Sequence, residues 1–437
     1  MADLSRDCDI VNMSNSDELP IPSKILSGLG DLLPSLEDVY KDLHAHPELS
    51  MEEHRTADIA GQHLKKHGYQ VTSGIGGTGL IGVMENGEGP SIMLRADMDG
   101  LPLKETTGLD YASKASGQDK EASPKAHACG HDMHVTWLMG VSRLFADQRD
   151  AWAGTLIVLF QPGEETAEGA RAMLRDGLHD KLPARKPEVV LGQHVMVGPA
   201  GTVAGCSGPI TFAADSLKIR LFGKGAHGSM PQSSIDPVVM AASTVLRLQT
   251  IVSRELSASE LAVVTVGSIQ AGTKSNIIPD EAVILMNIRT LDTSVRKRVL
   301  ESIERIVNAE AQASNAPRPP EITTIDSYPL NVNDEKASHR VRDAMSRHFG
   351  NQRVIDTGPN PASEDFGCFG TELGIPSVYW FVGGTDPQVY DKAKREGTIH
   401  HLPVNHSPDF APVLRPTLAV GVEAMVTAAM AWLGKRS

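Results

Sequence analysis

The chain has 437 residues, a length that favours two domains over one. A formal net charge of −13 argues against sequence-independent binding to nucleic acid and against docking on an anionic membrane, since both need clusters of Lys and Arg. Its four cysteines are few and widely spaced, which argues against a disulfide framework and favours a cytoplasmic location.

The first elements are expected in this order. Residues 1–23 form a polar leader without the apolar segment of a secretory signal. Apolar residues then recur at helical spacing, and short apolar runs between turn residues indicate strands. The sequence predicts helices at 32–43 and 52–67, strands at 79–84 and 91–95, and a polar loop at 114–125.

The next segment alternates regularly between helix and strand. The periodicity predicts helices at 131–145 and 165–176, and strands at 154–160 and 189–194. The strand at 154–160 (GTLIVLF) is a continuous apolar run, which is typical of a strand buried on both faces. This alternation predicts an α/β domain with a largely parallel, helix-covered sheet.

The pattern changes near residue 208. Strands are expected at 213–222, 261–269 and 282–289, with helices at 236–256, capped by Asp236, and at 293–313. This order predicts a small α+β domain of ferredoxin-like character. From about residue 330 a helix, the strand 377–381 and a terminal helix restore the α/β pattern. We therefore expect a discontinuous domain at 24–207 and 325–437, interrupted by an inserted domain at 208–324.

Cys129-Gly130-His131 is the first candidate for chemistry. Thiolate and imidazole are ligands that zinc-like ions take readily, and glycine allows a tight turn between them. The alternative is a buried thiol beside a helix-capping histidine. The neighbouring His127, Asp132 and His134 favour metal binding, and Asp132 could hold a ligand imidazole from outside the coordination sphere.

Glu164-Glu165 is the second candidate, because two adjacent carboxylates follow an apolar strand. One carboxylate could bind a metal while the other takes a proton from metal-bound water. An acidic pair stabilised by a helix dipole is the alternative. Asp97 or Asp99, after the strand at 91–95, could orient a ligand imidazole or could simply end the strand in an acidic turn.

Further histidines complete the candidate site. His194 ends the strand at 189–194, on the edge of the sheet where the other groups are expected. His406 lies far along the chain, and spacing alone does not separate it from His400 and His401.

The inserted domain contributes three polar candidates. The imidazole of His227 and the amide of Asn276 could stabilise an oxyanion, and Arg289 could grip a carboxylate. The alternative is ordinary polarity at loops and strand ends.

Seven motifs now indicate a family. HACGHDMH, FQPGEE, GQHV, GKGAHGSMP, SNIIPD, SEDF and NHSP occur in the order found in dinuclear metallopeptidases of the aminoacylase and carboxypeptidase type. From about residue 35 onward the chain resembles the branch of that family that holds hippurate hydrolases, auxin-conjugate hydrolases and N-acyl-amino-acid amidohydrolases.

The resemblance implies a catalytic domain interrupted by a lid and dimerisation domain, and hence a homodimer. It implies that Cys129 bridges two divalent ions whose coordination is completed by His131, Glu165, His194 and His406. It assigns Glu164 as general base. His227 would assist the tetrahedral intermediate in the partner subunit's site, and Asn276 and Arg289 would hold the substrate carboxylate. Gly163, Gln232 and Gly100 depart from the usual residues of the branch without removing a ligand.

We therefore expect a metal-dependent amidohydrolase that cleaves N-acyl amino acids to a carboxylic acid and a free amino acid, through metal-bound hydroxide formed with Glu164. Zinc is the expected ion, with manganese, cobalt or nickel as alternatives. The expected partners are a small-molecule substrate and a second copy of the chain, with neither nucleic acid nor membrane. A dipeptidase or carboxypeptidase on the same scaffold is the alternative activity. A non-catalytic protein that holds a carboxylate ligand is the third hypothesis.

Overall fold

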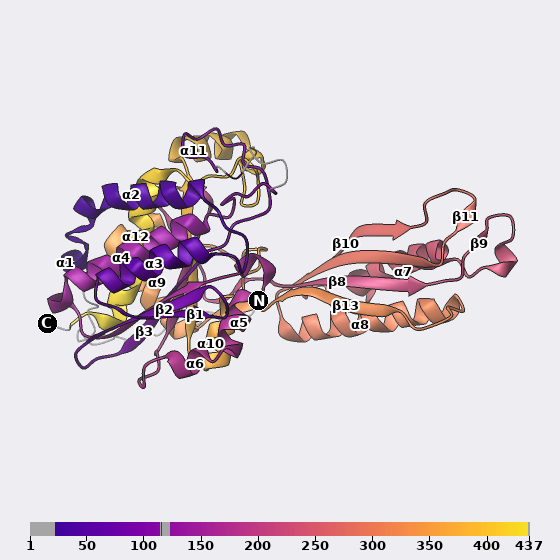
Figure 1. Ribbon diagram of the computed structural model, residues 1–437, viewed down its shortest axis with the longest axis horizontal. Coiled ribbons are helices and arrows are strands. Elements are labelled where there is room, and N and C mark those ends of the chain that lie inside the picture. The colour runs from indigo at the N-terminus through magenta and orange to yellow at the C-terminus, as the bar shows by residue number, and fades with distance from the viewer. Residues whose placement is uncertain (1–21, 114, 116–122, 436–437) are drawn as a thin grey trace, which may run out of the picture.

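The computed structural model describes residues 22–113, 115 and 123–435. Almost all of the predicted leader at 1–23, and most of the predicted loop at 114–125, therefore lie outside the described residues. Figure 1 shows a large body from which a narrower arm projects to one side. We call this arm, built from residues 213–328, the lid.

The body is built around an eight-stranded sheet. Its strands lie in the order β1 (Gln70–Ile75), β2 (Gly79–Asn86), β4 (Gly154–Gln161), β3 (Ser91–Asp97), β5 (Val190–Pro199), β16 (Ser377–Thr385), β6 (Val203–Gly205) and β15 (Val354–Asp356). The four central strands β4, β3, β5 and β16 run parallel to one another. The prediction of a largely parallel sheet is confirmed, and antiparallel pairs occur where β1, β2 and β6 join it.

Helices cover both faces of this sheet. One face packs against α3 (His54–Lys66), α4 (His131–Asp147), α9 (Glu335–Phe349) and α12 (Leu414–Leu433), and α2 (Leu29–Ala45) packs on α4 and α12. The other face packs against α5 (Gly169–Arg175), α6 (Leu178–Lys181) and α10 (Gly367–Leu373). Every residue of β3 is buried, with Leu94 in the first core and Met93 in the second. The alternation of side chains along a strand thus supplies both cores.

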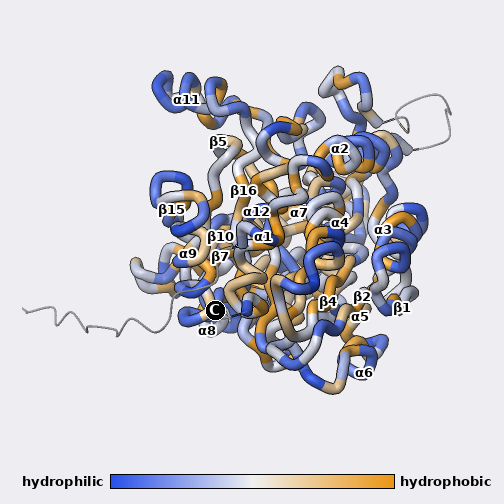
Figure 2. The backbone as a smooth tube through the Cα atoms, turned by 90° about the vertical axis from the view of Figure 1, so that its left-hand side faces the viewer, coloured by the Kyte–Doolittle hydropathy of each residue, from blue (hydrophilic) through white to orange (hydrophobic). Residues whose placement is uncertain are grey.

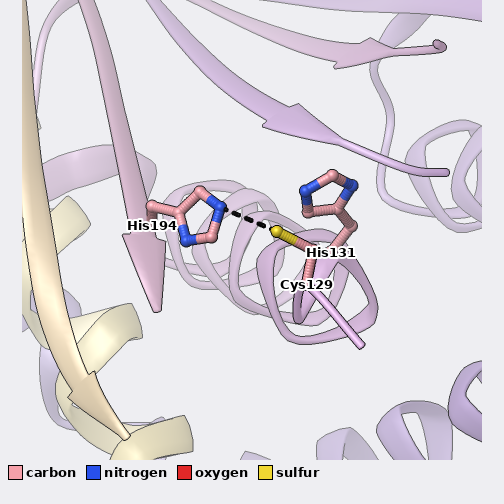
Figure 3. Close-up of side chains that lie close together, drawn as sticks. All are labelled: Cys129, His131 and His194. Carbon is pink, nitrogen blue, oxygen red and sulfur yellow. Dashed lines mark hydrogen bonds between the residues drawn. The ribbon is translucent and has the colours of Figure 1, made fainter. Parts of the chain in front are cut away.

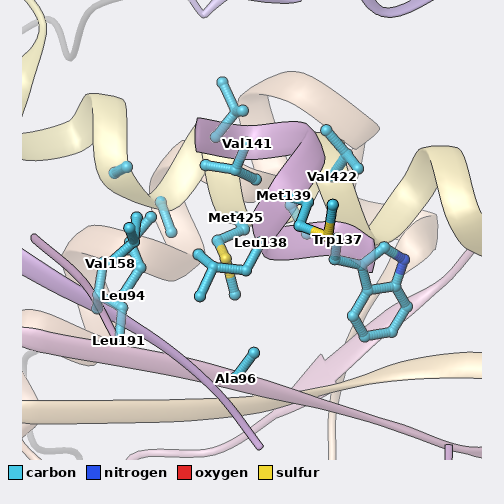
Figure 4. Close-up of a cluster of buried hydrophobic side chains, with 14 of the residues drawn as sticks. Leu94, Ala96, Trp137, Leu138, Met139, Val141, Val158, Leu191, Val422 and Met425 are labelled. Carbon is cyan, nitrogen blue, oxygen red and sulfur yellow. The ribbon is translucent and has the colours of Figure 1, made fainter. Parts of the chain in front are cut away.

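Helix α12 lies at the centre of the body. Val422 and Met425 of this helix pack with Trp137 and Leu138 of α4 above Leu94 of the sheet (Figure 4). By length and composition α12 could cross a membrane, but 78% of its apolar window is buried inside the protein, as in a core helix. Apolar segments gather in the interior of the body, whereas α11 (Pro387–Glu396) at the periphery is largely hydrophilic (Figure 2).

The lid is an antiparallel sheet with helices on one face. Its strands lie in the order β10 (Ala262–Ala271), β12 (Glu281–Thr290), β8 (Ala213–Phe222) and β13 (Glu321–Tyr328), packed against α7 (Pro237–Thr250) and α8 (Thr293–Ala313). The β-α-β-β-α-β order confirms the ferredoxin-like prediction. The Asp236 side chain accepts hydrogen bonds from the backbone at Val238 and Val239 and caps α7, as expected.

Several elements differ from the sequence-based expectation: strands β1, β6 and β15 of the body sheet were not expected, and two further differences lie close to the site. The predicted helix at 165–176 is a 3₁₀ turn at Glu164–Thr166 followed by α5, because Ala167 adopts a left-handed φ of 57° that a continuous helix excludes. Strand β13 was not predicted, since its sequence EITTIDSY is mostly polar, although Ile322 packs against the lid core. The expected boundary at 324 falls inside β13, so we propose the same domain division with the second boundary moved past Tyr328.

Candidate metal centre

The turn before α4 positions Cys129 and His131. Gly130 occupies the N-cap of α4 with a left-handed φ of 88°, and a Cβ there would lie 2.4 Å from the Val195 side chain. Glycine is therefore required both by the backbone conformation and by the close approach of β5. Both candidate ligands on either side of it are buried. The turn thus holds a thiol and an imidazole together at the carboxyl end of the sheet.

The turn after β4 positions Glu164 and Glu165. Gly163 before it also has a left-handed φ, of 54°. The Gly163 N–H donates to Glu53 Oε1 at 2.8 Å, and the Glu165 N–H donates to Asp99 Oδ2 at 3.0 Å. These carboxylates from neighbouring elements hold the turn in place, so that both glutamate side chains face the Cys129 turn.

The two remaining histidines approach from different parts of the chain. His194 ends the run of buried residues in β5; its Nδ1 donates to the Val195 carbonyl at 2.8 Å, and its Nε2 lies 3.4 Å from Cys129 Sγ (Figure 3). His406 Nε2 lies 3.2 Å from Glu165 Oε1. The structure therefore brings His406 to the cluster.

All five predicted metal ligands and Glu164 fall into overlapping clusters. Within each cluster the candidate ligand atoms lie within 4.8 Å of one another. The clusters are Cys129–His131–His194, Cys129–Glu165–His406 and His131–Glu164–Glu165. A mixed set of sulfur, nitrogen and carboxylate oxygen atoms at this spacing suits a zinc-like ion.

An unpaired buried atom shows that the cluster fits a cation. His131 Nδ1 donates to Asp99 Oδ1 at 3.0 Å, which leaves its Nε2 facing the cluster. That Nε2 is buried and has no hydrogen-bond partner among the described residues, and the buried Glu165 Oε1 lies 3.9 Å from it and 3.2 Å from His406 Nε2. Buried polar atoms are nearly always paired, so the unpaired His131 Nε2 facing a carboxylate oxygen fits a bound cation.

The pKa values of the candidate ligands and of Glu164 also fit a bound cation. Burial and the nearby Glu165 carboxylate raise the pKa of the Cys129 thiol, and burial and Glu364 raise the pKa of Glu164. Burial and His134 lower the pKa of His194, so this imidazole stays neutral and can act as a ligand. A bound divalent cation would offset the neighbouring carboxylates that help to raise the pKa of Cys129 and Glu164.

Carboxylates outside the cluster orient histidines in and around it. Asp99 holds His131, which is the role that the sequence left open between Asp97 and Asp99. Asp97 instead holds His134, whose Nε2 accepts from the Val195 N–H at 2.9 Å. Asp132 holds His44 at 2.6 Å rather than a candidate ligand. Second contacts of this kind set the ring orientation and the protonated nitrogen of a ligand histidine.

Sequence reasoning missed a buried charge cluster beneath the site. Arg95 is fully buried and forms ion pairs with Asp97, Glu364 and Asp365. Glu364 also accepts from the Tyr379 hydroxyl at 2.5 Å, and its carboxylate lies in a cluster with Glu164. An arginine inside an apolar strand was the available signal, because a buried guanidinium requires carboxylate partners.

The three lid candidates do not join the cluster within one chain. His227 and Asn276 are exposed beside β9 (Ala226–His227) and β11 (Ile277–Ile278), at the end of the lid far from the body (Figure 1). Arg289 lies at the opposite end and donates to the Pro361 carbonyl at 2.7 Å and to Ser363 Oγ at 3.0 Å. Arg289 therefore lies beside the segment that carries Glu364.

Known proteins share this sequence and fold. Residues 93–399 match the model of Peptidase family M20/M25/M40. A hippurate hydrolase of Campylobacter jejuni is 38% identical over 78% of this chain and 86% of its own length. An N-acetyl-L-cysteine deacetylase of Bacillus subtilis is 37% identical over 81% and 82%. A solved Bacillus subtilis structure, described as a dinuclear metal binding peptidase from the M20 family, superposes with a TM-score of 0.72 at 27% identity, over 92% and 98% of the two chains. The chain belongs to the peptidase family M20/M25/M40.

Proposed function

We propose that this chain is a metal-dependent amidohydrolase that cleaves N-acyl amino acids. One water is consumed, the C–N bond of the amide breaks, and a carboxylic acid and a free amino acid result. The observation that carries the proposal is the cluster of Cys129, His131, Glu165, His194 and His406, partly buried and open at His406, with the buried Glu164 beside it. The relatives named as a deacetylase and a hippurate hydrolase support the acyl-amino-acid substrate class.

Two divalent cations fit this arrangement, since the relative of solved structure is described as dinuclear and the candidate ligands form two groups around Cys129. Cys129, His131, Glu165, His194 and His406 are the residues that would hold the cations. When bound, the cations supply Lewis-acid polarisation of the amide carbonyl and lower the pKa of a coordinated water. We propose zinc as the ion, with manganese, cobalt or nickel as alternatives.

Glu164 is the proposed general base and acid. Its carboxylate takes a proton from the attacking water and passes that proton to the amide nitrogen as the C–N bond breaks. Burial and the neighbouring Glu364 raise the pKa of Glu164, which makes the carboxylate a better proton acceptor than an exposed glutamate. Glu165 in the same turn serves as a ligand, so the two adjacent carboxylates have different tasks.

We propose a homodimer formed through the lid. β10 lies at one edge of the lid sheet and exposes Val263 and Ile269, and α7 exposes Val239 and Leu246, the latter 73% accessible. An edge strand beside an apolar helix face is a surface that a second copy could extend and cover. In such a dimer His227 would stabilise the tetrahedral intermediate in the partner's site, and Asn276 and Arg289 would hold the substrate carboxylate.

A carboxypeptidase is the weaker alternative. The relatives named as thermostable carboxypeptidases are 30–31% identical to this chain, below the 37–38% of the deacetylase and the hippurate hydrolase.

We propose a cytoplasmic location. Among the described residues Cys129, Cys206 and Cys368 are free thiols, which supports this location.

The test is amino acid release from N-acetyl, N-benzoyl and indole-acetyl amino acids and from unblocked dipeptides, before and after chelation and metal add-back. Chelator-sensitive release from the acylated substrates is the expected result. Release from dipeptides alone would replace the proposal with the peptidase alternative. A folded, metal-loaded protein that releases nothing would favour a non-catalytic binding protein.

A further inference from the structure

The last strand of the lid contacts the residue proposed as general base. β13 pairs with β8 as far as Tyr328, opposite Ala214, and β14 (Asn331–Asn333) then returns the chain to the body by pairing with β7 (Gly208–Thr211). The Tyr328 hydroxyl donates a hydrogen bond to the backbone carbonyl of Glu164, at 3.1 Å. We call Ser327 and Tyr328, at the end of β13 where the lid joins the body, the hinge. The Tyr328 side chain therefore holds the backbone that positions Glu164.

A second contact ties the hinge to the other end of the same turn. Arg171 of α5 donates to the carbonyl of Ala167 at 3.1 Å and to the carbonyl of Ser327. Ala167 closes the turn, because its own N–H donates to the Glu164 carbonyl at 2.9 Å. Two consecutive hinge residues, Ser327 and Tyr328, are thus linked to both ends of the Glu164 turn.

The lid side of the hinge is held by charged hydrogen bonds. Arg296 of α8 forms two 2.7 Å bonds with the Asp215 carboxylate of β8 and a third with Ser327 Oγ. Ser327 Oγ also donates to Asp215 at 2.9 Å. Paired bonds between a guanidinium and a carboxylate are directional and strong, so the hinge residues move with the lid sheet and helix.

The turn that carries Glu164, on the body side of the hinge, keeps its backbone conformation only through contacts with other segments. The turn contains two left-handed residues, Gly163 and Ala167, and alanine is strained in this conformation. Such a backbone persists only where its surroundings hold it. Burial and the Glu164 carboxylate raise the pKa of Tyr328, so its hydroxyl stays protonated and remains a donor.

We propose that Tyr328 is a positioning residue that couples the orientation of the lid to the placement of Glu164. This inference rests on the proposed function, because it assigns Glu164 the general-base role. When the lid shifts about the hinge, Tyr328 moves with β13 and the Glu164 carbonyl follows it. The Glu164 carboxylate is then correctly positioned for the attacked amide in only some orientations of the lid.

The test is Tyr328→Phe, which removes one hydroxyl and keeps the ring. We expect kcat to fall about tenfold, since small displacements of a reacting group cost rate steeply, and KM to stay within about twofold. In a Glu164→Asp background, where the base is already displaced, the same substitution costs less than tenfold. Ile325→Ala is the matched control, because this residue of β13 is 57% exposed. Equal losses in the control, or full additivity with Glu164→Asp, would overturn the coupling.

Amide hydrogen exchange gives a readout that needs no turnover. Residues 163–169 include the Ala167 N–H, whose acceptor is the carbonyl that Tyr328 holds. We expect Tyr328→Phe to accelerate exchange in this segment severalfold, and Ile325→Ala to leave it unchanged. Unchanged exchange in Tyr328→Phe would contradict the inference even if the wild type hydrolyses N-acyl amino acids. A wild type without activity would remove the proposed function, while the exchange result would still decide whether Tyr328 holds the turn.

Discussion

The body and the lid use their polar residues differently. In the body, ligand candidates from four separate segments meet within one chain; Cys129 and His131 are buried, Glu165 and His194 are partly buried, and His406 is exposed. In the lid, His227 and Asn276 are exposed and lie far from that cluster (Figure 1). The body therefore carries a preassembled site, whereas the proposed lid contribution depends on a second copy. A preassembled site avoids reorganisation at the moment of reaction, and a divided site makes activity depend on association.

Glu164→Gln should have the largest effect on activity. It tests whether the body carries a preassembled site. Loss of general acid–base catalysis is expected to lower kcat by about 10²–10⁴-fold. The metal content should stay at the wild-type level, because Glu165 rather than Glu164 is the proposed ligand. Kinetics and elemental analysis check both results, with the exposed Glu168→Gln as control. Loss of metal from Glu164→Gln would make Glu164 a ligand instead.

His227→Ala tests whether the lid of one subunit contributes to the site of its partner. We expect kcat to fall about 10²–10³-fold, as for removal of other oxyanion-stabilising groups. Mixing this variant with Glu164→Gln and allowing subunits to exchange should restore about a quarter of the wild-type activity, since half of the dimers are mixed and each has one intact site. If His227 acted within its own chain, mixing would restore nothing.

Asp99→Asn tests whether a carboxylate at the edge of the candidate metal site keeps the ligands of the body in place. Asp99 holds the His131 imidazole and the Glu165 backbone, so its loss should weaken metal affinity about 10–100-fold. Competition with a chelator measures that affinity without turnover. Asp110→Asn, at an exposed position, should leave it unchanged. An unchanged affinity in Asp99→Asn would mean that the orientation of His131 is set by packing alone.

His63 is expected to affect stability and not catalysis. Burial and His67 lower the pKa of His63 to about 4, below the value of about 6.5 expected in the unfolded chain. The unfolded state thus binds the proton first, so His63 contributes stability that is present above pH 6.5 and is lost as the pH falls toward 4. His63→Gln should make unfolding less pH-dependent in that window by at most about 3 kcal/mol. Denaturant titrations at pH 7 and pH 4.5 measure this, with the exposed His54→Gln as control. If the free energy of unfolding depended equally on pH in both variants, the lowered pKa of His63 would be contradicted.

The elements that sequence reasoning predicted best are those with strong local signals. The apolar runs of β3 and β4 and the Asp236 cap of α7 required no tertiary information. β13 was missed because an edge strand can be mostly polar and is defined by its pairing partner. The 165–176 helix was extended too far because the left-handed φ of Ala167 comes from contacts around the turn and not from its residue type.

The candidate ligands were chosen from residue types, strand ends and the family motifs, so their identity was accessible from sequence. Spacing alone could not choose among His400, His401 and His406. The fold does so, because the His406 N–H donates to the Ala128 carbonyl and its ring reaches Glu165. The partners of Arg95 were also inaccessible, since Glu364 and Asp365 lie about 270 residues further along the chain.

By itself the sequence determined the α/β class, the inserted α+β segment and the residue types of a metal site, because periodicity and ligand chemistry are local properties. Only the tertiary structure decided which carboxylate supports which histidine, that Arg95 is buried among three acids, and that Tyr328 contacts the Glu164 turn. Those pairings join segments that are distant in sequence. Their geometry follows from strand order and from the crossings between body and lid, which no local pattern encodes.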